Sequence, residues 1–281
     1  MYNEYQEDLA DEFCDQGKHS LQELITQSPI HPIICKSLRL TNPDLRDKDI
    51  ALIGKNFKGL VKVTISTSRF IRGSTLGTLP STVKILDLEG CENVSDEGIE
   101  QLQKLTSLRI LSLASLSMTT AKFDFLPTSL VELIFGWAEY FIDSGLLKLK
   151  HLVNLKTLII KHGDELTGST LGNLPVSLET LELTKCKKLE EENLKNLKYL
   201  VNLKTLTIQF SEITGKFIGE LPISIEKLLF FQCHKLSEGM KELSRLENLK
   251  ELRFDAASKP AIANVSSKIF NLPHFESIKF V

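Results

Sequence analysis

The apolar positions of this chain recur in one pattern from residue 35 to residue 281. Eleven segments share the pattern φ-x-x-φ-x-φ, in which φ is an apolar residue and x is any residue. The middle φ falls at Leu38, Val63, Leu86, Leu111, Leu133, Leu158, Leu181, Leu206, Leu228, Leu252 and Ile278. Successive middle positions lie 22 to 26 residues apart. Self-similarity at such a period is the signature of a repeat architecture.

Each of the eleven segments predicts one short β-strand. The last two apolar residues of the pattern are two positions apart, so they point to one side of a strand, and their neighbours point to the other side. One such strand cannot bury its apolar side alone. The segments are therefore expected to stack as parallel strands over a continuous core, stabilised by contacts between neighbouring turns.

The pattern resembles the L-x-x-L-x-L consensus of leucine-rich repeats, and the resemblance covers residues 35 to 281. It implies an α/β fold, namely a right-handed solenoid with the shape of an arc or horseshoe and about eleven turns. A parallel β-sheet is expected on its concave face, with alternating helices and short irregular or 3-10 segments on its convex face.

Two kinds of segment alternate between the predicted strands. "GCENVSDEGIEQLQKLTSL" and "KCKKLEEENLKNLKYLVNL" resemble cysteine-containing leucine-rich repeats, whose convex segment is an α-helix. Ile99, Leu102 and Leu105 have the spacing of one helical face. "LTGSTLGNLPVSL" and "ITGKFIGELPISI" resemble the LP-containing repeats common in bacterial proteins, in which a proline ends the convex segment. The double unit of about 47 residues indicates duplication of a pair.

The two ends of the solenoid need separate explanations, because open ends expose core. Residues 1–34 lie outside the pattern, and "SLQELITQS" within them predicts an N-terminal helical cap of one or two short helices. The solenoid domain is expected to span residues 35–281. The last segment, "FESIKFV", ends on a strand, so we expect this edge to meet a further segment, a partner or another copy.

Composition narrows the classes of function. A formal net charge of −2 offers no electrostatic case for binding nucleic acid or an anionic membrane surface. No apolar run approaches the roughly 20 residues needed to span a bilayer. The acidic, polar start does not resemble a secretory signal, and five cysteines without paired spacing indicate a reducing compartment. A cytoplasmic location is therefore expected.

Catalytic and metal-binding motifs are not evident in the sequence. No nucleotide-binding, metalloprotease or nucleophile-elbow motif occurs, and the histidines lack metal-ligand spacing, so no enzyme activity, metal or cofactor is predicted. Cys91, Cys186 and Cys233 follow strands at the asparagine-or-cysteine position of the repeat, and Cys35 is its first apolar residue. They are expected to be buried thiols. A nucleophilic Cys14, with His19 nearby, is the enzymatic alternative.

The residues predicted to contact a partner lie on the concave face and on the turn after each strand. Apolar side chains are unusual on a solvated face, and the predicted contact residues there are Ile134, Ile159, Leu229 and Phe231. The residue one position beyond the third outward-facing position is normally small or polar, and Trp137 and Phe210 are the exceptions. His162 occupies the same position and Tyr140 follows Trp137 closely, and all four are predicted contact residues. Aromatic residues of this kind dominate interface hot spots. Alternatively, Trp137 folds over Ala138 and covers its own loop.

These features predict a non-catalytic module that binds a partner protein. The combination of LP-containing and cysteine-containing repeats resembles effectors of intracellular bacteria, which implies a eukaryotic host protein as the partner and delivery into the host cell. Two alternatives remain open. One is a substrate-recognition adaptor of a ubiquitin ligase that lacks its own F-box. The other is a self-assembling scaffold that uses the open C-terminal edge.

Overall fold

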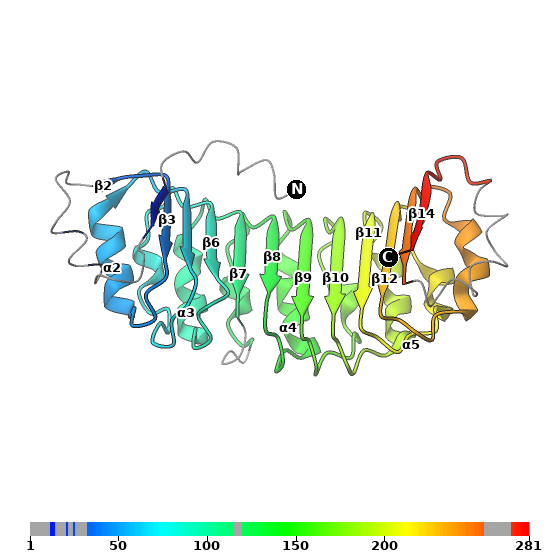
Figure 1. Cartoon of the computed structure of the whole chain (residues 1–281). Helices are drawn as coiled ribbons and strands as arrows, with labels where there is room; N and C mark the ends of the chain where they lie inside the picture. Colours follow the sequence, from blue (N-terminus) through cyan, green and yellow to red (C-terminus); the bar gives the residue numbers. More distant parts are fainter. Residues whose placement is uncertain are drawn as a thin grey trace. The chain divides into compact units, whose positions relative to one another are not determined.

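The computed structural model describes residues 33–114, 120–255 and 271–280, together with the backbone of residues 12–14 and with residues 21 and 25. The chain divides into two compact units, Met1–Trp137 and Ala138–Val281. In both units, parallel strands form one layer, and short helices form a second layer behind it (Figure 1). This is the two-layer α/β arrangement expected from the repeat pattern.

The strands of the first unit run in parallel. Most of them form a main sheet in chain order, and one short pair is separate from it. The main sheet has the order β1 (Glu12–Cys14), β3 (Ser37–Leu40), β5 (Lys62–Ile65), β6 (Ile85–Leu88), β7 (Ile110–Leu113) and β8 (Glu132–Phe135). The separate pair consists of β2 (Ile33–Ile34) and β4 (Phe57–Lys58).

The second unit repeats this arrangement. Its parallel sheet has the order β9 (Thr157–Lys161), β10 (Thr180–Thr184), β11 (Thr205–Gln209), β12 (Lys227–Phe231), β13 (Glu251–Phe254) and β14 (Ser277–Phe280).

The register of the sheets confirms the predicted repeat alignment. Each of the eleven predicted middle positions lies in a strand, and within each unit neighbouring turns pair at this position, as Leu38 does with Val63 and Leu181 with Leu206. From Leu38 to Leu252 these residues have no exposed surface. The strands form where they do because this register places every leucine of the pattern in the core.

The predicted alternation of convex segments is also confirmed, with one difference. Longer segments contain α2 (Asp47–Asn56), α3 (Asp96–Gln101) with η2 (Leu102–Lys104), α4 (Asp143–Leu147) with η4 (Lys148–His151), and α5 (Glu191–Leu194) with η6 (Lys195–Tyr199). Shorter segments contain the 3-10 helices η1 (Leu76–Thr78), η3 (Phe123–Phe125), η5 (Leu171–Asn173) and η7 (Lys216–Glu220). The last long segment, η8 (Glu238–Arg245), is a 3-10 helix throughout.

The N-terminal region contains a strand that the sequence did not predict. Residues 12–14 form β1, which pairs in parallel with β3 and sets Cys14 opposite Arg39. Cys14 therefore has a place in the sheet, although the repeat pattern gave it none. Leu21 and Ile25 have helical backbone and are buried, and the helical cap over residues 1–34 stays a prediction. The boundary between cap and solenoid at residues 34 and 35 stays a prediction.

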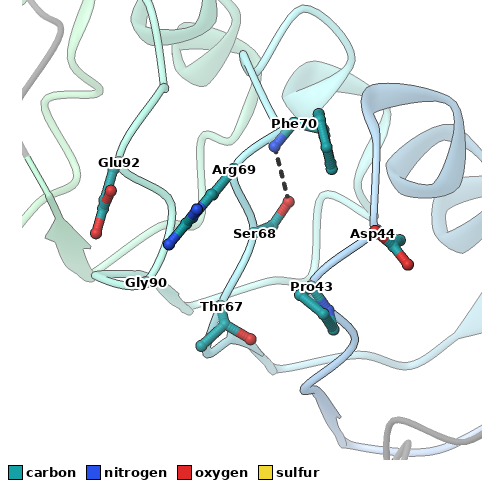
Figure 2. A pocket seen from close by; sticks show the side chains of 8 residues that line it. All are labelled: Pro43, Asp44, Thr67, Ser68, Arg69, Phe70, Gly90 and Glu92. Carbon is teal, nitrogen blue, oxygen red and sulfur yellow. Dashed lines mark hydrogen bonds between the residues drawn. The ribbon is translucent and has the colours of Figure 1, made fainter.

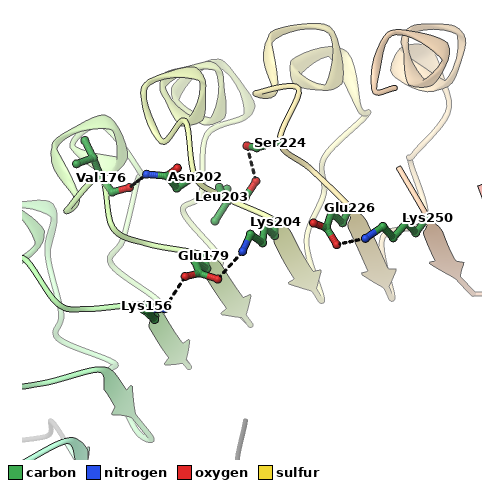
Figure 3. A network of polar contacts seen from close by, with 9 residues as sticks. All are labelled: Lys156, Val176, Glu179, Asn202, Leu203, Lys204, Ser224, Glu226 and Lys250. Carbon is green, nitrogen blue, oxygen red and sulfur yellow. Dashed lines mark hydrogen bonds and ion pairs between the residues drawn. The ribbon is translucent and has the colours of Figure 1, made fainter. Parts of the chain in front are cut away.

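Side-chain hydrogen bonds join successive turns at the edge where the strands begin (Figure 3). In LP-containing turns a serine donates to the turn before it: Ser177 Oγ lies 2.8 Å from the Leu155 carbonyl oxygen, and Ser224 Oγ lies 2.8 Å from that of Leu203. In two other turns an asparagine does so: Asn202 Nδ2 lies 2.9 Å from the Val176 carbonyl oxygen, and Asn248 Nδ2 lies 2.9 Å from that of Ile223. These bonds satisfy carbonyl groups that the strands leave unpaired.

Candidate functional site

The face of the first unit's sheet that points away from the helices, called the outer face below, is more tightly packed than its sequence suggested. Ile85 and Ile110 face each other on adjacent strands, and they are 8% and 7% exposed. Ile134, a predicted contact residue, is only 5% exposed. Strands about 4.8 Å apart bring side chains on one face into contact, so branched residues cover each other. Ile134 therefore offers little surface to a partner.

Glu132 lies on the same face and is also buried, at 5% exposure. Among the residues that the structure describes, it makes no ion pair or side-chain hydrogen bond. Burial penalises the charged carboxylate and raises the pKa of Glu132 above its usual range.

The residue that follows each of the strands β9 to β12 adopts a left-handed backbone. His162, Lys185, Phe210 and Gln232 occupy equivalent positions, with φ between 54° and 59°. This conformation lets the amide of His162 donate to the Thr184 carbonyl oxygen at 2.8 Å, and that of Lys185 to the Gln209 carbonyl oxygen at 3.0 Å. The bonds extend the parallel ladder beyond the strands.

Phe210 is an unusual residue for this left-handed position. Bulky side chains rarely occur there, because the conformation crowds the Cβ atom. The ring of Phe210 is 48% exposed, and Lys185 Nζ lies 5.4 Å from its centroid. A strained backbone that presents an exposed aromatic ring is a pattern found at functional sites.

Trp137 differs from its equivalents in backbone as well as in side chain. Its φ is not positive, and the amide of the next residue, Ala138, donates to the Lys161 carbonyl oxygen at 3.0 Å. Ala138 is fully buried, whereas Trp137 is 46% exposed. The indole therefore retains about half of its surface for contact.

Tyr140, on the loop that follows Trp137, is 64% exposed. The loop after β5 has an equivalent residue that the sequence analysis missed. Aligning Thr67–Ile71 with Trp137–Phe141 places Phe70 at the position of Tyr140, and Phe70 is 48% exposed. This alignment, extended beyond the strands, was the signal that could have found it.

Two adjoining pockets surround Phe70. One has a volume of about 500 Å³, and its lining is drawn in Figure 2: Pro43, Asp44, Thr67, Ser68, Arg69, Phe70, Gly90 and Glu92. The other, of about 490 Å³, shares Arg69 and Phe70 and adds Arg46, Asp47, Lys48, Arg72 and Asn93. The Arg46 guanidinium lies 4.8 Å from the centroid of the Phe70 ring. An arginine stacked on an exposed ring provides both apolar and cationic contact.

The remaining predicted contact residues lie in the second unit and are half-buried. Ile159, Leu229 and Phe231 lie on the outer face of their sheet, and His162 lies on the turn after β9. Ile134 and Trp137 belong to the first unit, so the joint patch that the sequence indicated stays a prediction.

A cluster of charges lies near Leu229 on the outer face. Glu251 accepts from Arg253 Nε at 2.8 Å and from Lys279 Nζ at 3.2 Å, and Lys227 Nζ lies 3.7 Å from it. Burial pushes the pKa of Glu251 upward, but the hydrogen bonds and charges of Arg253 and Lys279 outweigh it, so the pKa is lowered. Glu251 is ionised at neutral pH and holds these cations together.

The structure places the repeat cysteines in the core. Cys35, Cys91, Cys186 and Cys233 are buried, as predicted. Burial raises the pKa of Cys91, Cys186 and Cys233 to about 12, so these thiols are protonated and poorly nucleophilic at neutral pH. Within the described part of the chain, no group of three His, Cys, Asp or Glu residues could hold a metal ion. Nor is any helix there long and apolar enough to cross a bilayer.

Comparisons with known proteins extend these observations. No protein-family model matches the sequence, and no curated protein matches it. Among solved structures, the leucine-rich repeat-containing protein LegL7 from Legionella pneumophila is similar with a TM-score of 0.57 and 14% identity, over 96% of this chain and 90% of that one. An internalin, InlF, from Listeria monocytogenes is similar with a TM-score of 0.53 and 14% identity, over 93% of each chain. With its parallel strands in repeat register, the chain therefore has the leucine-rich-repeat fold.

Proposed function

We propose that this chain is a non-catalytic interaction module that binds a partner protein through the loops after the strands and the outer face of the sheet. One observation carries the proposal. Large aromatic side chains are exposed on these loops, although the residues of the hydrophobic core are buried. The exposed residues are Phe70, Trp137, Tyr140 and Phe210, between 46% and 64% accessible. Such side chains bury large areas at low entropic cost when they bind.

The phenylalanine at position 210 adds a specific argument. The turn favours glycine or asparagine, because only these residues adopt a left-handed backbone readily. A bulky ring at this place contributes little to the fold, and it is accessible to a partner. We expect it to act with Trp137 and Tyr140 in recognition.

We further propose that the partner is a eukaryotic host protein and that the chain acts as a secreted bacterial effector in the host cytoplasm. The alternation of LP-containing with cysteine-containing repeats supports this proposal, as does the bacterial source of two proteins with the same fold. An adaptor that supplies substrates to a ubiquitin ligase uses the same kind of surface, and it remains the second candidate.

The experiment compares capture of proteins from a eukaryotic lysate by the wild-type chain and by variants, followed by affinity measurement with the identified partner. Trp137→Ala and Tyr140→Ala are expected to weaken binding at least tenfold, as hot-spot residues do. Phe210→Asn is expected to weaken binding too, while its free energy of unfolding is unchanged or higher by up to about 1 kcal/mol, because strain is relieved.

Tyr199→Ala is the matched control, because Tyr199 is an exposed aromatic residue, 58% accessible, on η6 behind the sheet. It should leave affinity unchanged. If all three loop variants bind as tightly as the wild type, the loops are not the binding surface. If Trp137→Ala lowers the free energy of unfolding by several kcal/mol, as loss of a core aromatic does, the tryptophan is structural.

A further inference from the structure

A stripe of exposed aliphatic side chains runs along the second unit, at the edge where its strands begin. Val153, Val176, Val201 and Ile223 occupy the same position in four successive turns, two residues before the first apolar residue of each repeat. They are 66%, 62%, 60% and 62% exposed. With turns about 4.8 Å apart, the aliphatic stripe is roughly 14 Å long.

The repeat itself does not require apolar residues at this position. In the first unit the exposed residues at this position are Lys58, Ser81, Thr106 and Thr128, and the remaining one, Ile33, is buried. In the turn after Ile223 the position is taken by Glu247, which is also exposed. A contiguous apolar stripe that polar residues replace elsewhere in the same fold indicates an interaction surface.

A row of charges of alternating sign accompanies the stripe, three residues further along each turn. Its members are Lys156, Glu179, Lys204 and Glu226, followed by Lys250 (Figure 3). Within the chain, Glu179 lies 2.9 Å from Lys156 and 2.8 Å from Lys204, and Glu226 lies 2.7 Å from Lys250. The lysines remain 38% to 48% exposed, so the row is ordered but accessible.

The order of these charges determines which arrangement of a second copy brings opposite charges together. A twofold axis that crosses the stripe between Val176 and Val201 reverses the order of the turns in a second copy. It sets Val176 against the second copy's Val201, and Val153 against its Ile223. Over the four turns of the stripe, the same axis sets lysine against glutamate: Lys156 faces Glu226 and Glu179 faces Lys204. Both patterns are thus self-complementary under one operation, as a symmetric interface demands.

The other symmetric arrangement is disfavoured. A twofold axis that runs along the stripe places each turn against the same turn of the second copy. This operation also carries the second copy's charged row to the other side of the stripe, so the two rows do not meet and add no charge pairing across the interface. The alternating row therefore selects the antiparallel arrangement, while the aliphatic stripe supplies the apolar contact.

We propose that the stripe and its charged row form a homodimer interface, in which two copies of this chain pair antiparallel through their second units. Four aliphatic side chains and their flanking charges make a smaller contact than a permanent interface. The dimer is accordingly weak, and it forms at micromolar concentrations or above. It leaves the loops after the strands, at the opposite ends of the strands, free for another partner.

Sedimentation velocity over a range of concentrations tests the proposal on the whole chain. The wild-type mass should rise from 31.6 kDa toward twice that value as concentration increases. The variant Val176→Thr/Val201→Thr introduces the residue type found at this position in the first unit, and threonine has the shape of valine. We expect its dissociation constant to be at least tenfold higher. Ile34→Thr, at a 75% exposed position of the first unit, is the control and should change nothing.

Charge reversal tests the arrangement. Glu179→Lys should weaken dimerisation, because the new lysine faces Lys204 of the second copy. Adding Lys204→Glu should restore dimerisation, since the two signs are then exchanged together. A wild-type chain that stays monomeric at high micromolar concentration overturns the proposal, and so does a dimer that neither the threonine nor the charge variants affect. Both results are independent of whether the loop variants bind the partner protein.

Discussion

Glu132 and Glu251 show how neighbours set the behaviour of a single residue. Both occupy the first outward position of their strands, and both are largely buried, at 5% and 8% exposure. Three cations lie within 4 Å of Glu251, and its pKa is lowered despite burial. Glu132 has no ion pair among the described residues, and its burial raises the pKa. The two carboxylates therefore affect stability in opposite directions as pH changes.

We predict that Glu132→Gln stabilises the chain at neutral pH. Because the folded pKa of Glu132 lies above its ordinary value of 4.5, the ionised carboxylate lowers stability at every pH above the folded pKa. The variant should raise the free energy of unfolding by roughly 1 kcal/mol at pH 7. The gain should shrink as pH falls through the folded pKa, and it should vanish below about 4.5. Urea unfolding at several pH values measures it.

Glu251→Gln is the matched comparison with the opposite sign. The folded pKa of Glu251 is lowered, so its contribution to stability is fully present above its ordinary value and is lost as pH falls through the folded one. This variant should be less stable than the wild type at pH 7, and the difference should fade in acid. If Glu132→Gln destabilises the chain at pH 7, then Glu132 makes a favourable interaction and the argument from burial is wrong.

At the residue scale, the sequence predicted the strand face on which a side chain lies better than it predicted how exposed that side chain is. The register correctly placed Leu133 and Phe135 in the core and Ile134 on the other face. It did not predict that Ile134 is covered, because packing between strands depends on the side chains of both neighbours. The left-handed backbone at Phe210 was also not predictable from the sequence. Small or polar residues usually occupy this position because they adopt that backbone more readily, and a phenylalanine does not indicate it.

At the scale of elements, the acidic residue that begins a convex helix stabilises the following turn. Asp143 Oδ2 accepts from the Thr167 amide at 2.9 Å and from Thr167 Oγ1 at 2.8 Å. Glu191 accepts in the same way from Thr214, at 2.9 and 2.7 Å. Acidic residues near a helix start usually act through capping and dipole effects. The structure adds a connection between neighbouring turns.

We predict that Asp143→Ala lowers the free energy of unfolding by about 1–3 kcal/mol, because the partly buried amide of Thr167 loses its acceptor. Asp143→Asn keeps an acceptor oxygen in place, so it should cost less than half as much. Thermal and urea unfolding compare the two. Equal losses in both variants would indicate that the negative charge at the start of α4, rather than the hydrogen bonds, provides the stability.

The alternation of α-helical and 3-10 segments was predictable, because the sequence shows both the prolines and the helical spacing of apolar residues. LP motifs precede β6, β8, β10 and β12, and a 3-10 helix lies before each proline, as expected of a residue that ends a helix. The helix type of η8 was not predictable. Met240 and Leu243 are buried in it as in the α-helical turns, so apolar spacing alone does not separate the two helix types.

At the scale of the whole molecule, the repeat pattern predicted the fold because every turn buries the same positions. Binding surfaces are less predictable, because the fold tolerates many residues at exposed positions. Phe70 and the aliphatic stripe became visible only after exposure was known for each repeat position. Contacts between neighbouring turns carry the fold, so stability is expected to be local along the chain.

This locality yields a prediction about the two units. Leu206 lies on β11 in the second unit and is fully buried. Leu206→Ala should cost about 2–5 kcal/mol through lost burial and the cavity that remains. Because turns interact chiefly with their neighbours, the loss should appear as faster amide hydrogen exchange in residues 138–255, with exchange in residues 33–114 unchanged. Leu86→Ala, at the equivalent position of β6, should give the reverse pattern. If either variant accelerates exchange equally throughout the chain, the two units unfold as one cooperative body, and the repeats of each stabilise those of the other.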